Sequence, residues 1–292
     1  MRYSKALSPL FQGASRVLSA VVLSVGLSLG AAPPVAAFEH VSRDGIETFL
    51  DVTGFDVALD SVAQAADSAP GMLGLDPTDL GPAWTLTTRE VFAPERLHGM
   101  ALEFLEATLS AEQAKHAQDF YGSELGRKLV ELENASHVME DDEAKSAEGE
   151  ELVAEMVRDG SPRLQILKRM NKAIDASGSS VTAMQEVQMR FLLAASAAGL
   201  IDLDLDADML ADMQKAQEGE MRRSMQTSAL ANAAYTYREL SDAELEQYAE
   251  ALEQPLMQEV YALLNAIQFE IMANRFEVLA GRMSDMAPGQ DI

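Results

Sequence analysis

Three polar residues in the first half of the chain have a spacing that could bind a metal. Glu112, His116 and Asp119 would share one face of a helix. Two carboxylates and an imidazole are groups that bind zinc. The apolar residues of the same segment fall on the opposite face, so these three lie on its polar side. We therefore expect a solvated helix surface in preference to a metal site.

A second segment resembles the start of a calcium loop. Four aspartates alternate along it: Asp202, Asp204, Asp206 and Asp208. A calcium loop of the EF-hand type also needs glycine at its sixth position and glutamate at its twelfth. Counted from Asp202, these positions hold Ala207 and Met213. The calcium loop is rejected in this form, and we expect an acidic connector that ends at the N-cap of a helix.

No catalytic motif accompanies these clusters. The sequence has no Gly-x-Ser-x-Gly elbow, no phosphate-binding glycine loop and no cysteine. No two of its four histidines stand four residues apart on a helix. The sequence therefore assigns no catalytic, cofactor-binding or metal-binding residue. We expect no cofactor and no enzymatic activity.

The composition predicts an all-α fold. Aromatic residues make up 6 % of the 292 residues, and alternating β-branched runs are almost absent. Strong helix formers dominate instead. Only Thr85–Thr88 is suggestive of extended structure. The 16 methionines suit an irregular helical core.

Several helices can be placed from their apolar stripes and their terminal residues. Ser42 is a suitable N-cap for a stripe that starts at Ile46, and Gly54 would end that helix. Pro94 and Pro162 can each open a helix at its first turn. The nearly uncharged segment 181–200 predicts a buried helix.

The N-terminus has the order of a cleavable secretory signal. Basic residues precede an uncharged run at 17–32, and Val35-Ala36-Ala37 supplies small residues for cleavage. The run is shorter than the roughly 20 residues that a membrane-spanning helix needs. We expect cleavage after residue 37, a periplasmic location and no membrane span in the mature chain. Retention of the signal as an anchor is the alternative.

The mature chain would be strongly acidic. The signal carries three basic residues and no acidic one, so its removal shifts the formal charge from −25 to −28. Such a charge disfavours nucleic acid and anionic lipid surfaces as partners. Because the chain has no cysteine, neither disulfides nor lipid attachment at cysteine can occur.

Two segments repeat one apolar pattern without gaps at an offset of 131 residues. In the first segment the stripe follows Leu109-Ser110 and consists of Ala114, Ala117, Tyr121, Leu125, Leu129 and Leu132. In the second it follows Leu240-Ser241 and consists of Leu245, Tyr248, Leu252, Leu256, Val260 and Leu263. The matching spacing predicts an internal duplication.

Both segments contain a helix interruption at the same place. Gly122-Ser123 interrupts the first and Gln254-Pro255 the second. The stripe keeps its phase across each break, which favours one kinked amphipathic helix per copy over a tight hairpin. Arg127-Lys128 follows the first break as an isolated basic pair, for which we expect an acidic partner in the other copy.

The repeat and the charged stretch Glu140–Glu143 divide the chain. We expect a multi-helix bundle of two related units. The predicted divisions are a signal at 1–37, repeat unit 1 at 38–139, an acidic linker with inserted helices at 140–180, repeat unit 2 at 181–286 and a C-terminal tail at 287–292.

The segment Leu109–Leu129 resembles the signature helix of an exported bacterial family, the domain of unknown function number 2059. The matching residues are Phe120, Tyr121, Ser123, Gly126, Arg127 and Lys128. Glu124 stands where that family usually has proline. The segment 46–62 is similar to the opening helices of the family.

The second segment, Leu240–Tyr261, is a more divergent match. It keeps Pro255 but has Ala251-Leu252 in place of the Phe-Tyr pair and Met257 in place of the glycine. The resemblance covers both halves of the chain but not the insert. It implies a small helical domain in a Gram-negative cell envelope, and it implies no reaction, because none is established for the family.

Two classes of function follow from these observations. We expect a non-catalytic periplasmic module that binds a protein or peptide partner in the cell envelope, in a groove between the two units. The alternative is a protein that binds a small molecule or a metal, or an unrecognised hydrolase. A deep pocket with convergent polar groups would favour the alternative.

Overall fold

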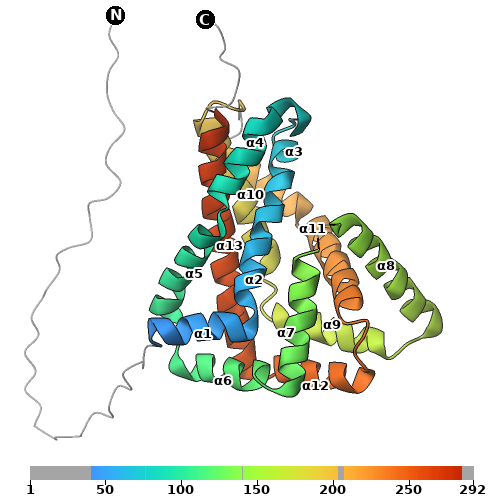
Figure 1. Cartoon of the computed structure of the whole chain (residues 1–292). Helices are drawn as coiled ribbons and strands as arrows, with labels where there is room; N and C mark the ends of the chain where they lie inside the picture. Colours follow the sequence, from blue (N-terminus) through green and yellow to red (C-terminus); the bar gives the residue numbers. More distant parts are fainter. Residues whose placement is uncertain (1–40, 76, 140, 203–206, 285–292) are drawn as a thin grey trace, which may run out of the picture. The chain divides into compact units, whose positions relative to one another are not determined.

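Helices account for nearly all of the structure (Figure 1). The computed structural model describes residues 41–75, 77–139, 141–202 and 207–284, and these ranges contain no strand. The predicted all-α class is confirmed. The helices of the first half are α1 (Arg43–Thr53), α2 (Phe55–Asp60), the 3-10 helix η1 (Ser61–Ser68), α3 (Ala69–Met72), α4 (Pro77–Val91), α5 (Pro94–Thr108), α6 (Ala111–Tyr121) and α7 (Glu124–His137). Those of the second half are α8 (Asp142–Asp159), α9 (Arg163–Ile174), α10 (Ser180–Ala197), α11 (Ala207–Thr236), α12 (Asp242–Leu252) and α13 (Pro255–Ser284).

Helix α1 begins and ends where the sequence predicts. The hydroxyl of Ser42 accepts a hydrogen bond from the backbone N–H of Gly45, and Gly54 ends the helix in the left-handed conformation at φ 69°. All four residues of the predicted stripe are buried: Ile46, Phe49, Leu50 and Thr53. The short following helix α2 therefore starts in a new direction directly after Gly54.

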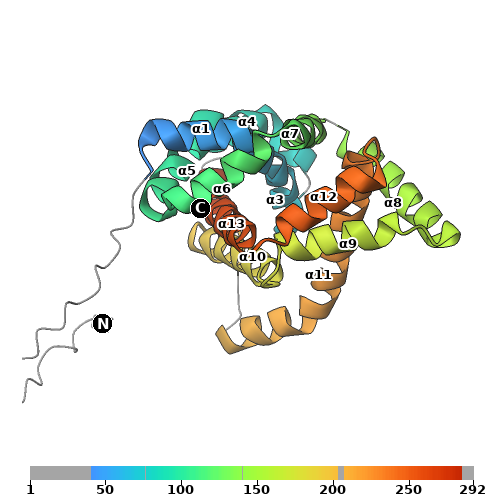
Figure 2. The same cartoon turned by 90° about the horizontal axis from the view of Figure 1, so that it is seen from below.

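Helix α13 forms the centre of the core. It contacts α4, α5, α6, α9 and α10, and in Figures 1 and 2 it runs through the middle of these helices. Its Phe276 meets the rings of Phe92 and Phe191 edge to face, with centroids 5.8 and 5.3 Å apart. A helix that is apolar around most of its circumference needs such enclosure.

Two predictions for the flanking helices need correction. Segment 181–200, predicted as a buried helix, forms α10, which buries only the face toward α13, while Leu193 on the other face is 48 % exposed. The low charge of this segment does not mean burial on all sides. Thr85–Thr88, the only suggestion of extended structure, is helical within α4, where burial of Trp84 and Val91 outweighs a weak local preference.

The two helix breaks lie at the predicted residues and form corners. Helix α6 ends at Tyr121 and α7 begins at Glu124, after Ser123 with an extended backbone whose hydroxyl caps the new helix. Helix α12 ends at Leu252 and α13 begins at Pro255. In neither case does the second helix fold back antiparallel to the first (Figure 1). The apolar stripes continue through both corners, with Leu129 and Val260 buried after them.

Helices α6 and α12 also start in the same way. Ser110 and Ser241 stand 131 residues apart, and each forms a capping box, in which the side chains and backbones of the N-cap and third helical residues bond reciprocally. The acidic run after α7 also contains an N-cap, because the Asp141 carboxylate accepts a 2.9 Å hydrogen bond from the N–H of Ala144. This confirms the run as a helix start.

The capping boxes should contribute equally to stability. We expect Ser110→Ala and Ser241→Ala each to lower the free energy of unfolding by about 1 kcal/mol, because each leaves a backbone N–H at a helix start without its acceptor. Urea titrations followed by circular dichroism measure both changes. Ser228→Ala, on an exposed stretch of α11, is the control and should change the free energy by less than about 0.5 kcal/mol. Equal stability of all three variants would contradict the assignment of the caps.

The described residues all belong to one compact unit. The helices of the two predicted repeat units contact each other within it, since α13 packs on α5 and α6, and α11 packs on α7. Helix α9, from the segment predicted as an insert, packs on α12. The described helices therefore share one core.

Candidate ligand-binding cavity

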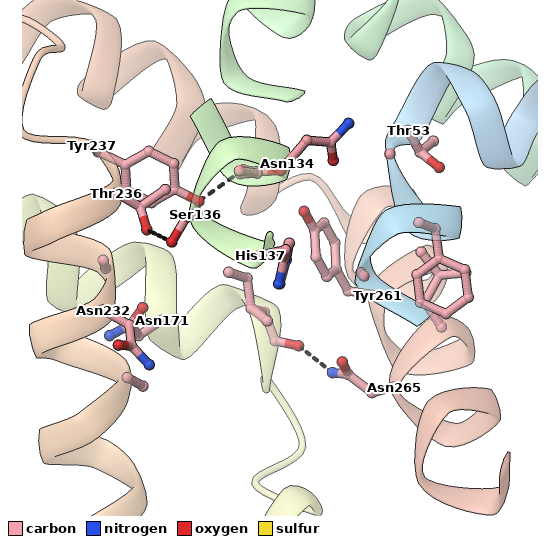
Figure 3. Close-up of a pocket in the computed structure, with 18 of the residues that line it drawn as sticks. Thr53, Asn134, Ser136, His137, Asn171, Asn232, Thr236, Tyr237, Tyr261 and Asn265 are labelled. Atoms are coloured by element: carbon pink, nitrogen blue, oxygen red, sulfur yellow. Dashed lines mark hydrogen bonds between the residues drawn. The ribbon is translucent and has the colours of Figure 1, made fainter. Parts of the chain in front are cut away.

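A cavity of about 370 Å³ lies among helices from both halves of the chain (Figure 3). Its walls are the joint between α1 and α2 together with side chains of α6, α7, α8, α9, α11, α12 and α13. The residues that line the cavity differ in exposure: Tyr248 is fully buried, whereas Asn232 is exposed to solvent. Its size is in the range of pockets that hold small molecules.

Four tyrosine hydroxyls and one carboxylate form a hydrogen-bond network at the buried end of the cavity. Tyr237 and Tyr248 donate hydrogen bonds of 2.7 and 2.9 Å to Oε1 of Glu133. The hydroxyl of Tyr248 is also 3.1 Å from that of Tyr121 and 3.0 Å from that of Tyr261. Tyr121 and Tyr261 are hydrogen-bonded to each other. The phenolic protons can therefore all be directed along one network that ends on Glu133.

Burial controls the ionisation of this cluster. Loss of hydration raises the pKa of Glu133, while the hydrogen bonds from Tyr237 and Tyr248 act in the opposite direction. Burial and the neighbouring carboxylate raise the pKa of Tyr121, Tyr237, Tyr248 and Tyr261. At neutral pH the four phenols are therefore protonated and act as donors.

The raised pKa of Glu133 predicts a pH dependence of stability. The folded state binds the proton of this carboxyl more tightly than the unfolded chain does. The protonated carboxyl therefore stabilises the folded state at a pH below the pKa of the unfolded chain, and this stabilisation is lost as the pH rises through the pKa of the folded state. The difference in unfolding free energy between wild type and Glu133→Gln should therefore shift in favour of the variant between about pH 4 and about pH 7. Urea titrations at both values measure it. Glu131→Gln, an exposed change on the same helix, should show no such shift.

Amide side chains and an imidazole line the middle of the cavity (Figure 3). The Nδ2 group of Asn265 donates a 3.0 Å hydrogen bond to the backbone carbonyl of Ile174 at the end of α9. The buried Oδ1 atom of Asn134 has no hydrogen-bond partner among the described residues. Burial and the charge of Lys145 lower the pKa of His137, so its imidazole is neutral at pH 7.

Gly54 fixes how closely the α1–α2 joint approaches α7. A Cβ atom on Gly54 would lie 2.7 Å from Oδ1 of Asn134 and 2.9 Å from Cγ1 of Val130. The positive φ of 69° also disfavours any other residue there. The glycine thus lets the wall of the cavity close over Asn134.

The offset of 131 residues continues into the cavity. Asn134 on α7 corresponds to Asn265 on α13, and His137 corresponds to Gln268 one turn later; all four line the cavity. These residues are not predicted from the apolar stripe, because the stripe ends at Leu132 and Leu263. Extending the comparison by one helical turn would have found the identical asparagines.

Most residues singled out from the sequence lie elsewhere. Asp119, from the metal-spaced group on α6, forms an ion pair with Lys115 at 2.7 Å. Among the described residues, no group of three or more histidine, aspartate or glutamate side chains is placed to hold a metal ion. Of the alternating aspartates, Asp204 and Asp206 lie outside the described residues.

The basic pair after the first corner has the acidic neighbour that the sequence predicts. The ammonium of Lys128 lies 2.6 Å from Oε1 of Glu244, the residue that completes the capping box of α12. Arg127 donates instead to the backbone carbonyl of Gly122 within its own corner. Lys128 thus joins α7 to the start of α12, and the pair does not belong to the cavity.

Comparisons with known proteins add a family match for part of the chain. None of the described helices is long and apolar enough to cross a membrane. Neither the curated proteins nor the solved structures include a match to the sequence. Residues 95–155, which extend from the first turn of α5 into α8 and include the segment Leu109–Leu129, match the model of the family described as "Uncharacterized protein conserved in bacteria (DUF2059)", so this part of the chain is similar to that family.

Proposed function

We propose that this chain is a non-catalytic protein of the bacterial cell envelope that binds a small polar molecule in the cavity. The cavity carries the proposal, because polar side chains from several helices converge in a space large enough for an organic molecule. A protein or peptide partner in a groove was the first expectation from the sequence. A concave site of about 370 Å³ with convergent polar groups suits a small molecule better.

The features of the N-terminus support a periplasmic location. Residues 1–37 have the order of a cleavable signal and lie outside the described residues. The match to a family conserved in bacteria is compatible with this location. We propose export followed by cleavage after Ala37.

We further propose that the binding cavity lies between two copies of one helical unit. Matched capping boxes, matched corners and the pair Asn134 and Asn265 support the duplication. Helix α9 packs on α12 as α1 packs on α6, so the second copy would begin at α9, before residue 181. Each copy would then contribute one asparagine from the helix after its corner.

The proposal is tested by blocking the cavity at its exposed side. Ala229 on α11 is exposed and lines the cavity, so a tryptophan there can cover the space without disturbing the core. Native mass spectrometry of the mature protein purified from its own periplasm should show a retained small molecule, and Ala229→Trp should lose it.

Ser228→Trp is the matched control. Ser228 is the exposed neighbour of Ala229 on the same helix and does not line the cavity. This variant should retain the molecule as wild type does. Equal retention by both tryptophan variants would place the ligand elsewhere, and wild-type protein that binds no molecule from a metabolite extract would contradict the proposed function.

A further inference from the structure

The charges that line the cavity are not balanced. Two charged side chains line it, Glu133 and Lys145. The ammonium of Lys145 lies 2.6 Å from the carboxylate of Asp142 and also donates to the backbone carbonyl of Ser136. Glu133 has hydrogen bonds from phenols but no ion pair with a described residue. When ionised, the carboxylate of Glu133 is therefore without a counter-ion among the described residues.

Three oxygen acceptors around the cavity also lack donors. Both phenol hydrogen bonds to Glu133 end on Oε1, and Oε2 receives none from the described residues. Oδ1 of Asn134 is buried and unpaired. Oδ1 of Asn265 has no donor among the described residues, since only the Nδ2 group is engaged. Among the described side-chain atoms, Oδ1 of Asn134 alone is both buried and without a partner, and such an acceptor costs free energy. Oε2 of Glu133 and Oδ1 of Asn265 are not buried in this way, so a ligand or water in the cavity can donate to them.

These observations specify the chemistry of a ligand. The acceptors require N–H or O–H donors, and the uncompensated carboxylate requires a positive charge. The formal charge of −25 on the whole chain also favours cations over anions. A bare metal ion would leave most of a 370 Å³ cavity empty, so an organic cation fits the space better.

We propose that the cavity binds a small organic molecule that carries a primary ammonium group, with Glu133 as its counter-ion and with Asn265 as a specificity-determining acceptor. This inference rests on the proposed function. The ammonium donates to Oε2 of Glu133, while the network of phenols holds Oε1. The amide and imidazole groups along the lining bind the remaining polar part of the molecule.

Isothermal titration calorimetry with a matched pair of probes tests whether the cavity prefers a ligand with an ammonium group. We expect the full mature chain to bind 4-aminobutan-1-ol at least about tenfold more tightly than butane-1,4-diol, which has the same length and no charge, because a hydrogen bond to a charged group is stronger than a neutral one. Glu133→Gln should abolish this preference. Glu131→Gln, with the same loss of charge on an exposed position of α7, should keep it.

A second variant tests the inference even if Glu133→Gln does not fold. Asn134→Asp is close to isosteric and places a second negative charge beside the first, so it should tighten binding of the amine severalfold and leave that of the diol unchanged. Equal binding of the two probes to wild type, or an unchanged preference in Glu133→Gln, would contradict the proposal that the ligand carries an ammonium group bound by Glu133. A different result is that wild type binds the diol or glucose without preferring the amine, and that Ala229→Trp removes this binding. This result would refute the ammonium group of the ligand but support a small-molecule cavity. If neither a probe nor a metabolite binds, both the ammonium ligand and the proposed small-molecule function are wrong.

Discussion

Replacement of Gly126 by alanine should lower the free energy of unfolding by about 3 kcal/mol, as expected for severe overpacking. Gly126 lies in the first turn of α7, directly after the corner. A Cβ atom there would lie 2.2 Å from the backbone oxygen of Phe120 and 2.4 Å from Cα of Tyr121. Backbone atoms at the end of a helix cannot move aside as a flexible side chain can, so the corner itself must open. Urea titration monitored by circular dichroism measures the loss.

Gly281→Ala is the matched control for this change. Gly281 lies near the end of α13, is exposed, and a Cβ atom there would meet no atom within 4 Å. Alanine should therefore raise the stability by about 0.5–1 kcal/mol, because glycine loses more conformational freedom on folding. If both alanine variants are as stable as wild type, the described contact between α6 and α7 is wrong.

The corner gives a physical reason for the pattern that resembles the family. Phe120 and Tyr121 end α6, Ser123 caps α7, and Gly126 lets the first turn of α7 rest on the backbone of both aromatic residues. Tyr121 at the same corner points its hydroxyl into the cavity network. The motif thus shapes the corner and places one member of the cluster around Glu133.

Loss of the Tyr248 hydroxyl should have the second largest effect. We expect Tyr248→Phe to lower the free energy of unfolding by about 2 kcal/mol, the value typical of a hydrogen bond to a charged group. The side chain is fully buried, and its hydroxyl contacts Glu133, Tyr121 and Tyr261. Its ring is stacked on Phe120 at a centroid distance of 5.8 Å, and phenylalanine keeps that contact. Urea titration at neutral pH measures the change.

Tyr235→Phe separates the network from the general effect of removing a buried phenol. The hydroxyl of Tyr235 donates only to the sulfur of Met139, at 3.1 Å, and the side chain is 8 % exposed. Its removal should lower the free energy by less than about 1 kcal/mol, since a thioether is a weak acceptor. Equal losses in the two variants would mean that the cluster around Glu133 adds nothing to stability.

Local features of the fold could be predicted because their causes lie within a few residues. The N-cap at Ser42, the stop at Gly54 and the break at Gly122-Ser123 each depend on local backbone preferences and are confirmed. An acidic partner in the other copy could be predicted for the pair Arg127-Lys128, because a positive charge is unfavourable near a helix start, and the structure shows Glu244 beside Lys128. Burial was harder to predict, since the exposure of Leu193 on α10 depends on which faces α13 and α11 cover.

The cavity could not be predicted from local patterns. Its lining residues lie between Thr53 and Gln268 and come from helices that are adjacent only in the folded chain. Glu133 is an ordinary polar residue of an amphipathic helix until Tyr237, directly after α11, and Tyr248 on α12 donate hydrogen bonds to it. Among the sequence patterns, the repeat alone relates cavity residues that are far apart in the chain, because it makes Asn134 correspond to Asn265.

The most direct test of a small amine in the cavity is a crystal structure of the mature chain purified from its own periplasm. We expect density for an organic molecule inside the cavity, with a nitrogen atom within hydrogen-bond distance of Oε2 of Glu133 and further contacts to Asn134 or Asn265. A cavity that contains only water after soaking with 4-aminobutan-1-ol, or a ligand that binds away from Glu133, would contradict it.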